Sequence, residues 1–462
     1  MRRGRALYPA PARGLRPTSL RSEMAATEIA GDAGLKRTMG GLAASAMVAG
    51  IILGTSIFVQ PSEISRLVPN VPAMMAVWLF AGLLTLCGAM ACAELASAFP
   101  ETGGVYVFLR EGISPLAGFL WGWAMFWTMH SGIIAAIAVI IARYVGYFAP
   151  LGDRGVQGVA IGVILVLSGV NYFGVRQGSA VQTALTSAKV LALALIFVFV
   201  FAIAGSGRVP PVPVTNEPLP GPRAFLLATI AGLFAFGGWH MVTYTAGETR
   251  TAERTIPRAL LVGTLVVVAS YIGLNAAYLR VLPLQQMITS QRVAADAANA
   301  LVGRWGAAIV SALVILSGAS AVNGIILGGP RVYLAMAQDR LAFRWLAAVH
   351  SRFRTPHLAI LAQAIWSSVL VATGTYRGLF TRVVCTEWIF FALMVIAIFR
   401  LRRRPGYAPA YRVWGYPIIP ALFVAACAAI VCNQIVAAPR ESAVGLLFVV
   451  SGWPVYYMRM RA

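Results

Sequence analysis

The sequence predicts an all-α polytopic membrane protein with 12 transmembrane helices. Of its 462 residues, 59% are hydrophobic and 11% are charged, whereas a soluble globular chain carries about 25% charged residues. The mean hydropathy is +0.78, so the apolar side chains exceed what a water-soluble core can hold. Apolar runs of about 20 residues, the length that crosses a bilayer, recur along most of the chain.

Twelve apolar runs are long enough to form spanning helices. In chain order they are 41–59, 72–98, 116–148, 157–174, 181–205, 224–246, 258–280, 306–336, 357–373, 379–400, 416–437 and 442–458. Two longer connections separate some of them. Segment 208–223 is rich in proline, and we expect 283–304 to form a short interfacial element.

Basic residues fill the short connections, and their distribution predicts the orientation. Arginines are most frequent in alternate connections, which we expect to face the cytoplasm together with both termini, in the inner (plasma) membrane. The run Arg402-Arg403-Arg404 is expected to anchor the chain to anionic membrane lipids. The net charge of +22 is spread over these loops rather than over one face, which excludes a nucleic-acid site. Residues 1–37 are basic and contain several prolines, which predicts a disordered cytoplasmic tail. Met24 is an alternative start that would leave residues 1–23 untranslated.

Metal, cofactor and enzyme functions are not expected. All five cysteines lie within apolar segments, without the spacing of a zinc site or of a disulfide framework. The sequence contains no HExxH or GxSxG motif and no paired intramembrane aspartates.

Two spans contain clusters of glycine, within Gly50–Phe58 and Gly232–His240. Glycine weakens a helix by about 1 kcal/mol relative to alanine, so both segments are expected to be unwound. Unwound backbone is tolerated in a membrane where it lines a polar cavity, and such breaks in corresponding spans of two halves indicate a transporter site. The alternative is that the glycines only allow close helix packing. Exposed helix ends would suit a carboxylate, and freed carbonyls would suit an ammonium group.

Several motifs, in order along residues 40–430, resemble the amino acid–polyamine–organocation superfamily, with its L-type amino acid transporter branch and bacterial relatives. They are Gly54-Thr55-Ser56-Ile57-Phe58 with Pro61, Ala93-Glu94-Leu95, Phe99-Pro100-Glu101-Thr102-Gly103-Gly104-Val105-Tyr106, Phe234-Ala235-Phe236-Gly237-Gly238-Trp239, Ala321-Val322-Asn323-Gly324 with Pro330-Arg331, and Arg402-Arg403-Arg404-Pro405 with Tyr411-Arg412 and Gly415-Tyr416-Pro417. The resemblance implies a leucine-transporter-type fold, with a 5+5 inverted repeat and two additional C-terminal helices. The expected units are the tail 1–37, the repeats 38–206 and 207–402, and the final pair of helices in 403–462.

The resemblance also implies a substrate site at the two breaks. The segment Gly54, Thr55 and Ser56 would hold a substrate carboxylate through the amides of Thr55 and Ser56 and the Thr55 hydroxyl. The amine would be held by the carbonyls of Ile51, Phe234, Ala235 and Gly237, with the Phe234 ring as a gate. Trp239, His240 and His130 would face the substrate side chain. Ser56 stands where the family often has glycine, and His240 stands where it often has asparagine.

Lys189 lies within an apolar span, where a charged group is rare and usually functional. It is one of only two lysines, the other being Lys36. One interpretation is that Lys189 extends to the inner interface. The resemblance implies another interpretation: in relatives with a lysine at this position, the lysine ammonium group takes the place of a sodium ion. Ser317 and Ser320 are candidate partners of Lys189. On that interpretation transport is sodium-independent, by proton coupling or by exchange.

Other buried polar residues have structural interpretations beside the functional ones. His130 could equally be a satisfied core histidine, and Glu94 and Glu387 are expected to be helix-end or inter-helix partners. The leading function is alternating-access transport of amino acids around the breaks in the first and sixth spans. Neutral L-amino acids are the first candidates, because these two spans contain no acidic residue to bind a second cationic group. An amine or polyamine permease and a non-transporting amino acid sensor remain as alternatives.

Overall fold

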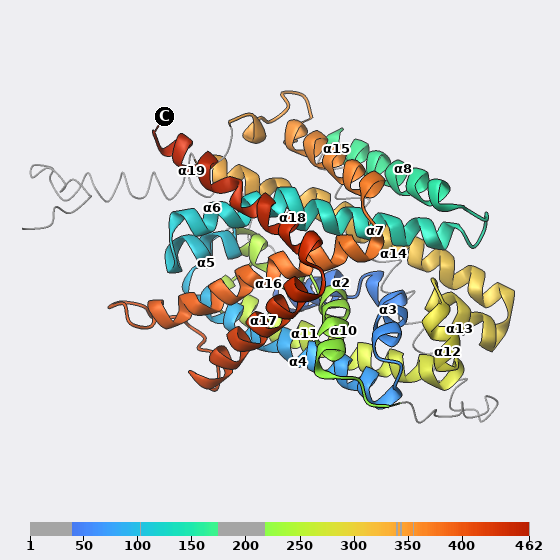
Figure 1. Cartoon of the computed structure of the whole chain (residues 1–462). Coiled ribbons are helices and arrows are strands. Elements are labelled where there is room, and N and C mark those ends of the chain that lie inside the picture. Colours follow the sequence, from blue (N-terminus) through green and yellow to red (C-terminus); the bar gives the residue numbers. More distant parts are fainter. Residues whose placement is uncertain are drawn as a thin grey trace, which may run out of the picture.

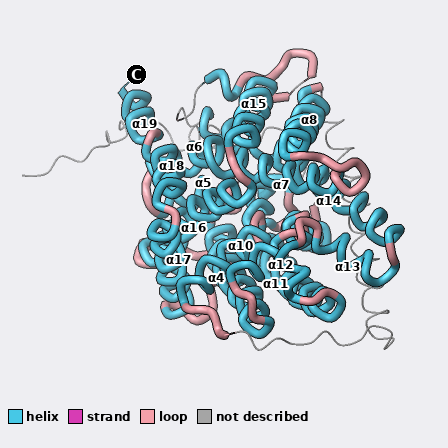
Figure 2. Tube along the Cα trace, turned by 45° about the vertical axis from the view of Figure 1, so that its right-hand side comes forward, coloured by secondary structure: helices cyan, strands magenta, loops and turns pink. Residues whose placement is uncertain are grey.

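The computed structural model describes residues 39–101, 103–173, 218–338, 341, 344–353 and 355–461. Within these residues the secondary structure is helical, apart from one isolated bridge between Met39 and Thr249. Figure 2 accordingly shows helices and loops only. The predicted tail 1–37 and the expected span 181–205, including Lys189, lie outside the described residues.

The described helices follow the apolar runs of the sequence closely. In chain order they are α2 (Gly41–Ile52), η1 (Ser56–Phe58), α3 (Gln60–Leu67), α4 (Val71–Ala98), α5 (Val105–Gly112), α6 (Pro115–Ala124), η2 (Met125–Met129), α7 (His130–Val145), α8 (Asp153–Tyr172), α10 (Pro222–Ala235), η3 (Trp239–Glu248), α11 (Ala252–Val281), α12 (Leu284–Thr289), α13 (Val293–Val302), α14 (Arg304–Gln338), η4 (Arg344–Ala347), α15 (His357–Thr373), α16 (Tyr376–Leu401), α17 (Ile418–Ala437), α18 (Pro439–Val450) and α19 (Gly452–Arg461).

Nine helical segments of the described part are long and apolar enough to cross a membrane. They are Gly41–Phe58, Val71–Ala98, Pro115–Val145, Asp153–Tyr172, Pro222–Gly247, Ala252–Val281, Arg304–Pro330, Tyr376–Leu401 and Ile418–Ala437. The expected ninth span is the shorter, 17-residue helix α15. The prediction of an all-helical membrane protein is therefore confirmed.

The expected last span, 442–458, is divided into α18 and α19 at Ser451. Pro454 lies in the first turn of α19 and has no amide hydrogen to donate to the carbonyl four residues earlier. The Ser451 hydroxyl also donates to the Phe448 carbonyl across 2.7 Å. Both features favour ending one helix and starting another at this point.

The bundle has two ends that are built from different elements (Figure 1). Helices α3, α12 and α13 lie together at the right-hand end, and the connection between α16 and α17 lies at the left-hand end. These are called the outer and the inner end, after the orientation that the charges predict. The expected interfacial element 283–304 corresponds to the two short helices α12 and α13. Between the ends, α11 packs against both α2 and α4, and α7 packs against α14, α8 and α16.

A short helix that the sequence did not predict, α5, follows α4 at the inner end. It begins after Gly103 and Gly104, whose φ angles are +125° and +51°. A side chain at Gly104 would collide with Thr243 in η3, so glycine allows this turn to approach the sixth span closely.

Glu94 joins α4 to the connection between α16 and α17. Its fully buried carboxylate accepts two hydrogen bonds from the Arg402 guanidinium, at 2.9 and 2.6 Å, and one from the Val413 amide at 2.6 Å. The Tyr407 hydroxyl adds a fourth contact at 3.3 Å. The hydrogen bond to Glu94 raises the pKa of Arg402, while burial raises the pKa of Tyr407. The expectation that Glu94 is an inter-helix partner is confirmed.

Candidate functional site

The first spanning segment is interrupted where the glycine-containing sequence predicts it. Helix α2 ends at Ile52, residues 53–55 form a bend, and a single 3₁₀ turn, η1, precedes α3. The amide of Gly54 folds back onto the carbonyl of Ile52. The interruption places the backbone of Thr55 and Ser56 at the start of η1, and both residues are buried.

The sixth spanning segment is interrupted in the same way. Helix α10 ends at Ala235, and the chain turns through Gly237 and Gly238 before η3 continues as a 3₁₀ helix. Gly238 has a φ of +92°, and a side chain there would lie 2.7 Å from the Ile51 side chain. Glycine is therefore required both for the turn and for the contact between the two interruptions.

The hydroxyl of Tyr271 on α11 holds the ends of the two interrupted helices together. It donates to the carbonyl of Ile52 at 2.6 Å and lies 3.1 Å from the carbonyl of Ala235. Each of these carbonyls belongs to the last residue of its helix, where the normal intrahelical partner is missing. Tyr271 is fully buried, so water does not compete for the two carbonyls.

The turn at Thr55 and Ser56 presents unused hydrogen-bonding groups. Their amides donate no hydrogen bond to the described backbone, and the buried Thr55 hydroxyl has no partner among the described residues. Buried donors without partners are costly, and a carboxylate is an acceptor that satisfies several at once. Unlike these donors, two of the carbonyls predicted to bind the amine already accept hydrogen bonds. The Phe234 carbonyl accepts one from the Gly237 amide at 3.1 Å, and the Ala235 carbonyl accepts one from the Tyr271 hydroxyl. Each of these oxygens retains a second lone pair.

Helix α14 approaches the first interruption through a glycine. A side chain at Gly318 would lie 2.9 Å from the Thr55 methyl group and 2.5 Å from Ile141. Ser317 and Ser320, the expected ion-coupling partners, lie in the same helical turn and are both buried. The structure thus brings α14 to the first interruption, while the third expected member, Lys189, lies outside the described residues.

The Phe234 ring packs against an aromatic column on α16. Its centroid lies 5.4 Å from that of Phe380, which lies 5.2 Å from that of Tyr376. Tyr376 accepts a hydrogen bond from the buried Gln60 side chain at 3.1 Å. Phe234, the residue expected to act as a gate, is buried, with 6% of its surface exposed.

His130 and His240 occupy a second buried layer toward the inner end. His130 lies beside Gly329, eleven residues along α14 from the glycine that contacts Thr55, which corresponds to about 16 Å. His240 packs among the rings of Trp121, Trp239, Tyr244 and Phe391, with centroid distances of 5.1–5.7 Å. None of the four ring nitrogens of the two histidines has a hydrogen-bond partner among the described residues. The structure separates His130 from the first interruption.

The sequence interpretation missed two features of this region. Tyr271 has a recognisable signal, since the hydroxyl of a tyrosine within an apolar span usually forms a hydrogen bond. The π-helical turn η2, which comes directly before His130, has no signal in the residue pattern, although such turns are frequent at functional sites.

The chain is similar in sequence to a known family and to several curated proteins. Residues 39–458 match the family described as amino acid permease. The chain is 31% identical over 430 residues to the serine/threonine exchanger SteT of Bacillus subtilis (strain 168), an alignment that covers 92% of this chain and 97% of the exchanger. It is 28% identical over 442 residues to the Homo sapiens large neutral amino acids transporter small subunit 2, covering 93% and 81% of the two chains. It is 26% identical over 435 residues to the Homo sapiens Asc-type amino acid transporter 1, covering 92% and 82%.

Proposed function

The chain belongs to the amino acid permease family, and from this premise we propose that it is a secondary transporter of neutral L-amino acids working by alternating access. The observation that carries the proposal is the junction at Tyr271, which holds two interrupted helices end to end. Interrupted helices at corresponding positions are the usual substrate site of transporters with inverted repeats.

The two ends of the substrate bind to the backbone of the two interruptions. The amides of Thr55 and Ser56, together with the Thr55 hydroxyl, hold the carboxylate. The carbonyls of Ile51, Phe234, Ala235 and Gly237 hold the ammonium group. Support for the first set comes from the unused buried donors at η1. Neither interruption, at residues 53–55 and 236–238, contains an acidic residue, which favours substrates without a second positive charge.

The substrate side chain is small and neutral. The serine/threonine exchanger among the relatives supports serine or threonine as the first candidates. Trp239 and His240 follow the second interruption directly, and the unpartnered nitrogens of His240 and His130 can bond to a hydroxyl group. When the site opens toward the inner end, a hydroxylated side chain reaches His240 first and His130 afterwards.

The proposed topology has twelve spanning helices with both termini in the cytoplasm. Units 38–206 and 207–402 are the two five-helix repeats, and 403–462 holds the final pair, in the inner (plasma) membrane. The nine described spanning segments and the helix α15 support this count. The similar interruptions after Ile52 and Ala235 support the repeat.

Transport is independent of sodium and proceeds by exchange or with a proton. Lys189 supplies a fixed positive charge in place of the ion, and Ser317 and Ser320 are its partners on α14. The approach of α14 to Thr55 at Gly318 supports this placement of the two serines.

Thermal unfolding of the purified protein tests the substrate class. A ligand that binds the folded state raises the melting temperature as its concentration exceeds the dissociation constant. We expect L-serine, L-threonine and other small neutral amino acids to raise it, and L-lysine and putrescine to have no effect. Stabilisation by putrescine alone would contradict the proposal and would instead indicate a polyamine permease.

A further inference from the structure

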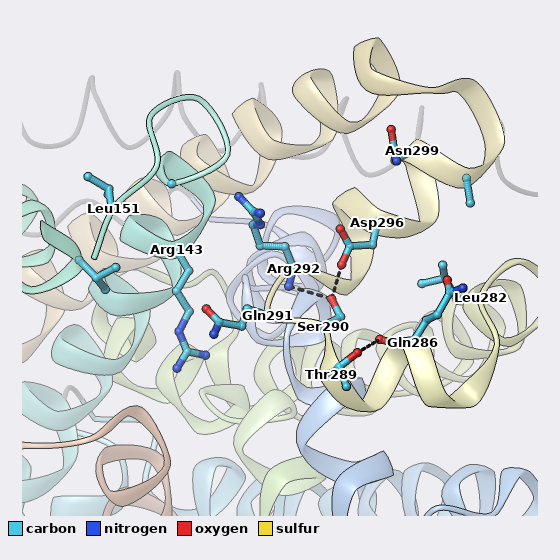
Figure 3. Close-up of a pocket in the computed structure, with 13 residues that line it drawn as sticks. Arg143, Leu151, Leu282, Gln286, Thr289, Ser290, Gln291, Arg292, Asp296 and Asn299 are labelled. Atoms are coloured by element: carbon cyan, nitrogen blue, oxygen red, sulfur yellow. Dashed lines mark hydrogen bonds between the residues drawn. The ribbon is translucent and has the colours of Figure 1, made fainter. Parts of the chain in front are cut away.

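A polar cavity of about 580 Å³ opens at the outer end of the bundle (Figure 3). It lies between the end of α7, the start of α8, and the short helices α12 and α13. Its lining consists of Arg143, Gly146, Leu151, Val156, Leu282, Gln286, Thr289, Ser290, Gln291, Arg292, Asp296, Asn299 and Ala300. Eight of these thirteen residues carry polar or charged side chains, and the volume lies within the range of small-molecule sites.

The charged residues of this outer cavity are complementary to a zwitterion. Neither Arg143 nor Arg292 forms an ion pair within the described part of the chain, and their guanidinium groups instead lie over the rings of Tyr376 and Tyr147. Asp296 accepts a hydrogen bond from the Ser290 hydroxyl through one carboxylate oxygen. Figure 3 shows Gln291 between Arg143 and Ser290, so amide groups line the space between the charges.

We propose that this cavity is a second amino acid binding site, in which Arg143 and Arg292 hold the substrate carboxylate and Asp296 holds its ammonium group. Arginine binds carboxylates through paired, charge-assisted hydrogen bonds, which makes it the suitable residue for this role. The arrangement does not suit a lipid chain, because the lining is mainly polar. It also does not suit a simple anion, because Asp296 would repel one.

A continuous column of side chains connects the outer cavity to the interruption in the sixth span. Arg143 Cζ lies 4.6 Å from the centroid of the Tyr376 ring, and the Tyr376 ring packs on Phe380, which packs on Phe234. The neighbour of Arg143, Tyr144, donates to the Phe58 carbonyl in η1 across 2.9 Å. A carboxylate bound in the cavity would attract the Arg143 guanidinium away from the Tyr376 ring. The series of rings that packs on Phe234 would then lose its cation–π contact. In this geometry, binding of a substrate in the outer cavity is coupled to opening of the substrate site at the two interruptions.

The choice of an amino acid as the ligand of the second site rests on the proposed function. The number of substrate molecules bound per chain tests whether the second site exists. Equilibrium dialysis of labelled L-serine against the full-length protein in lipid nanodiscs gives this number. We expect two molecules per wild-type chain and one molecule in the double variant Arg143→Gln/Arg292→Gln. Thr55→Trp, which blocks the interruption in the first span, also leaves one molecule, and combining it with the two arginine substitutions leaves none.

Arg280→Gln is the matched control, because Arg280 is exposed at the same end of the bundle and does not line the cavity. It leaves two molecules bound. Asp296→Asn is a second test that keeps both arginines, and we expect it to weaken binding at the outer site at least tenfold. Size-exclusion elution and thermal unfolding identify any variant that has lost its fold.

The outcomes separate this inference from the proposed function. One molecule per wild-type chain, unchanged by the arginine substitutions, would overturn the second site and leave the proposed transport intact. Two molecules that depend on Arg143 and Thr55 as described would support the second site even if the protein did not transport L-serine in liposomes.

Discussion

The Tyr271 hydroxyl donates its hydrogen to the carbonyl of Ile52 across 2.6 Å, within a fully buried environment. The bond joins α11 to the last residue of α2, at the point where the first spanning segment becomes irregular. Because the same oxygen lies 3.1 Å from Ala235, the geometry of both interruptions depends on one side chain. We therefore expect a substrate held between the two interruptions to depend on Tyr271 without contacting it.

Tyr271→Phe should impair transport and lower stability. A buried carbonyl without its partner costs about 1–3 kcal/mol, and a loss of about 1.4 kcal/mol from the transition state lowers a rate tenfold. We expect the rate of L-serine exchange to fall about tenfold and the melting temperature to decrease. Tyr278→Phe is the control: it lies on the same helix and is buried, but its hydroxyl has no partner among the described residues. Equal effects of the two substitutions would refute the role given to the Tyr271 bond.

Gly318→Ala should disturb the first interruption. The added methyl group would lie 2.9 Å from the Thr55 methyl group and 2.5 Å from Ile141, so both side chains must shift at the first interruption. We expect the apparent affinity for L-serine to fall at least tenfold in a binding assay. Gly328→Ala lies in the same helix with open space around the new methyl group, and it should change the affinity less than twofold. Normal binding of L-serine by Gly318→Ala would show that the close approach of Gly318 to Thr55 is not needed for substrate binding.

Glu94→Gln should destabilise the inner end of the bundle. Removing one member of a buried ion pair costs about 3–5 kcal/mol, because the other charge is left without its partner. Glu94 is fully buried against Arg402, whereas Glu111, paired with Arg110, has a side chain that is 39% exposed. Glu111→Gln should therefore change the free energy of unfolding by at most about 1 kcal/mol. Urea unfolding in detergent measures both variants, and similar values for the two would contradict a structural role for Glu94.

Replacing sodium by choline should leave the uptake of L-serine unchanged, and Lys189→Ala should abolish it. A fixed ammonium group needs no sodium ion, and Lys189→Ala removes that charge from the span. Lys36→Ala is the control, because Lys36 is the only other lysine and lies in the predicted tail. Uptake into liposomes that stops when sodium is removed would disprove sodium independence.

Local signals in the sequence predicted the parts of the fold that depend on composition. The length of the apolar runs predicted the positions of the described spans, and the glycine clusters predicted the interruptions after Ile52 and Ala235. Both predictions were possible because hydropathy and helix propensity depend on residues that are close in the sequence. The division at Ser451 was missed, although Pro454 was a visible cause. The bond between Tyr271 and Ile52 joins residues 219 positions apart, so no local pattern could reveal it.

The site was predicted less completely than the fold for the same reason. Motifs indicated Thr55, Ser56 and Phe234 as candidate site residues, and the structure places them at or next to the two interruptions. The layer in which His130 lies depends on where α7 meets α14, which a single sequence does not encode locally. The outer cavity combines Arg143 with Arg292 from a segment about 150 residues away, and only the packed bundle brings them together.

Counterflow of L-serine in proteoliposomes is the most direct measurement of the proposed transport. Liposomes that contain the purified protein and are loaded with unlabelled L-serine are diluted into medium with a trace of labelled L-serine and no sodium. We expect a transient accumulation of label inside the liposomes, which is absent from protein-free liposomes and strongly reduced by Tyr271→Phe. No accumulation with L-serine or any other neutral amino acid, from protein that still unfolds cooperatively, would contradict it.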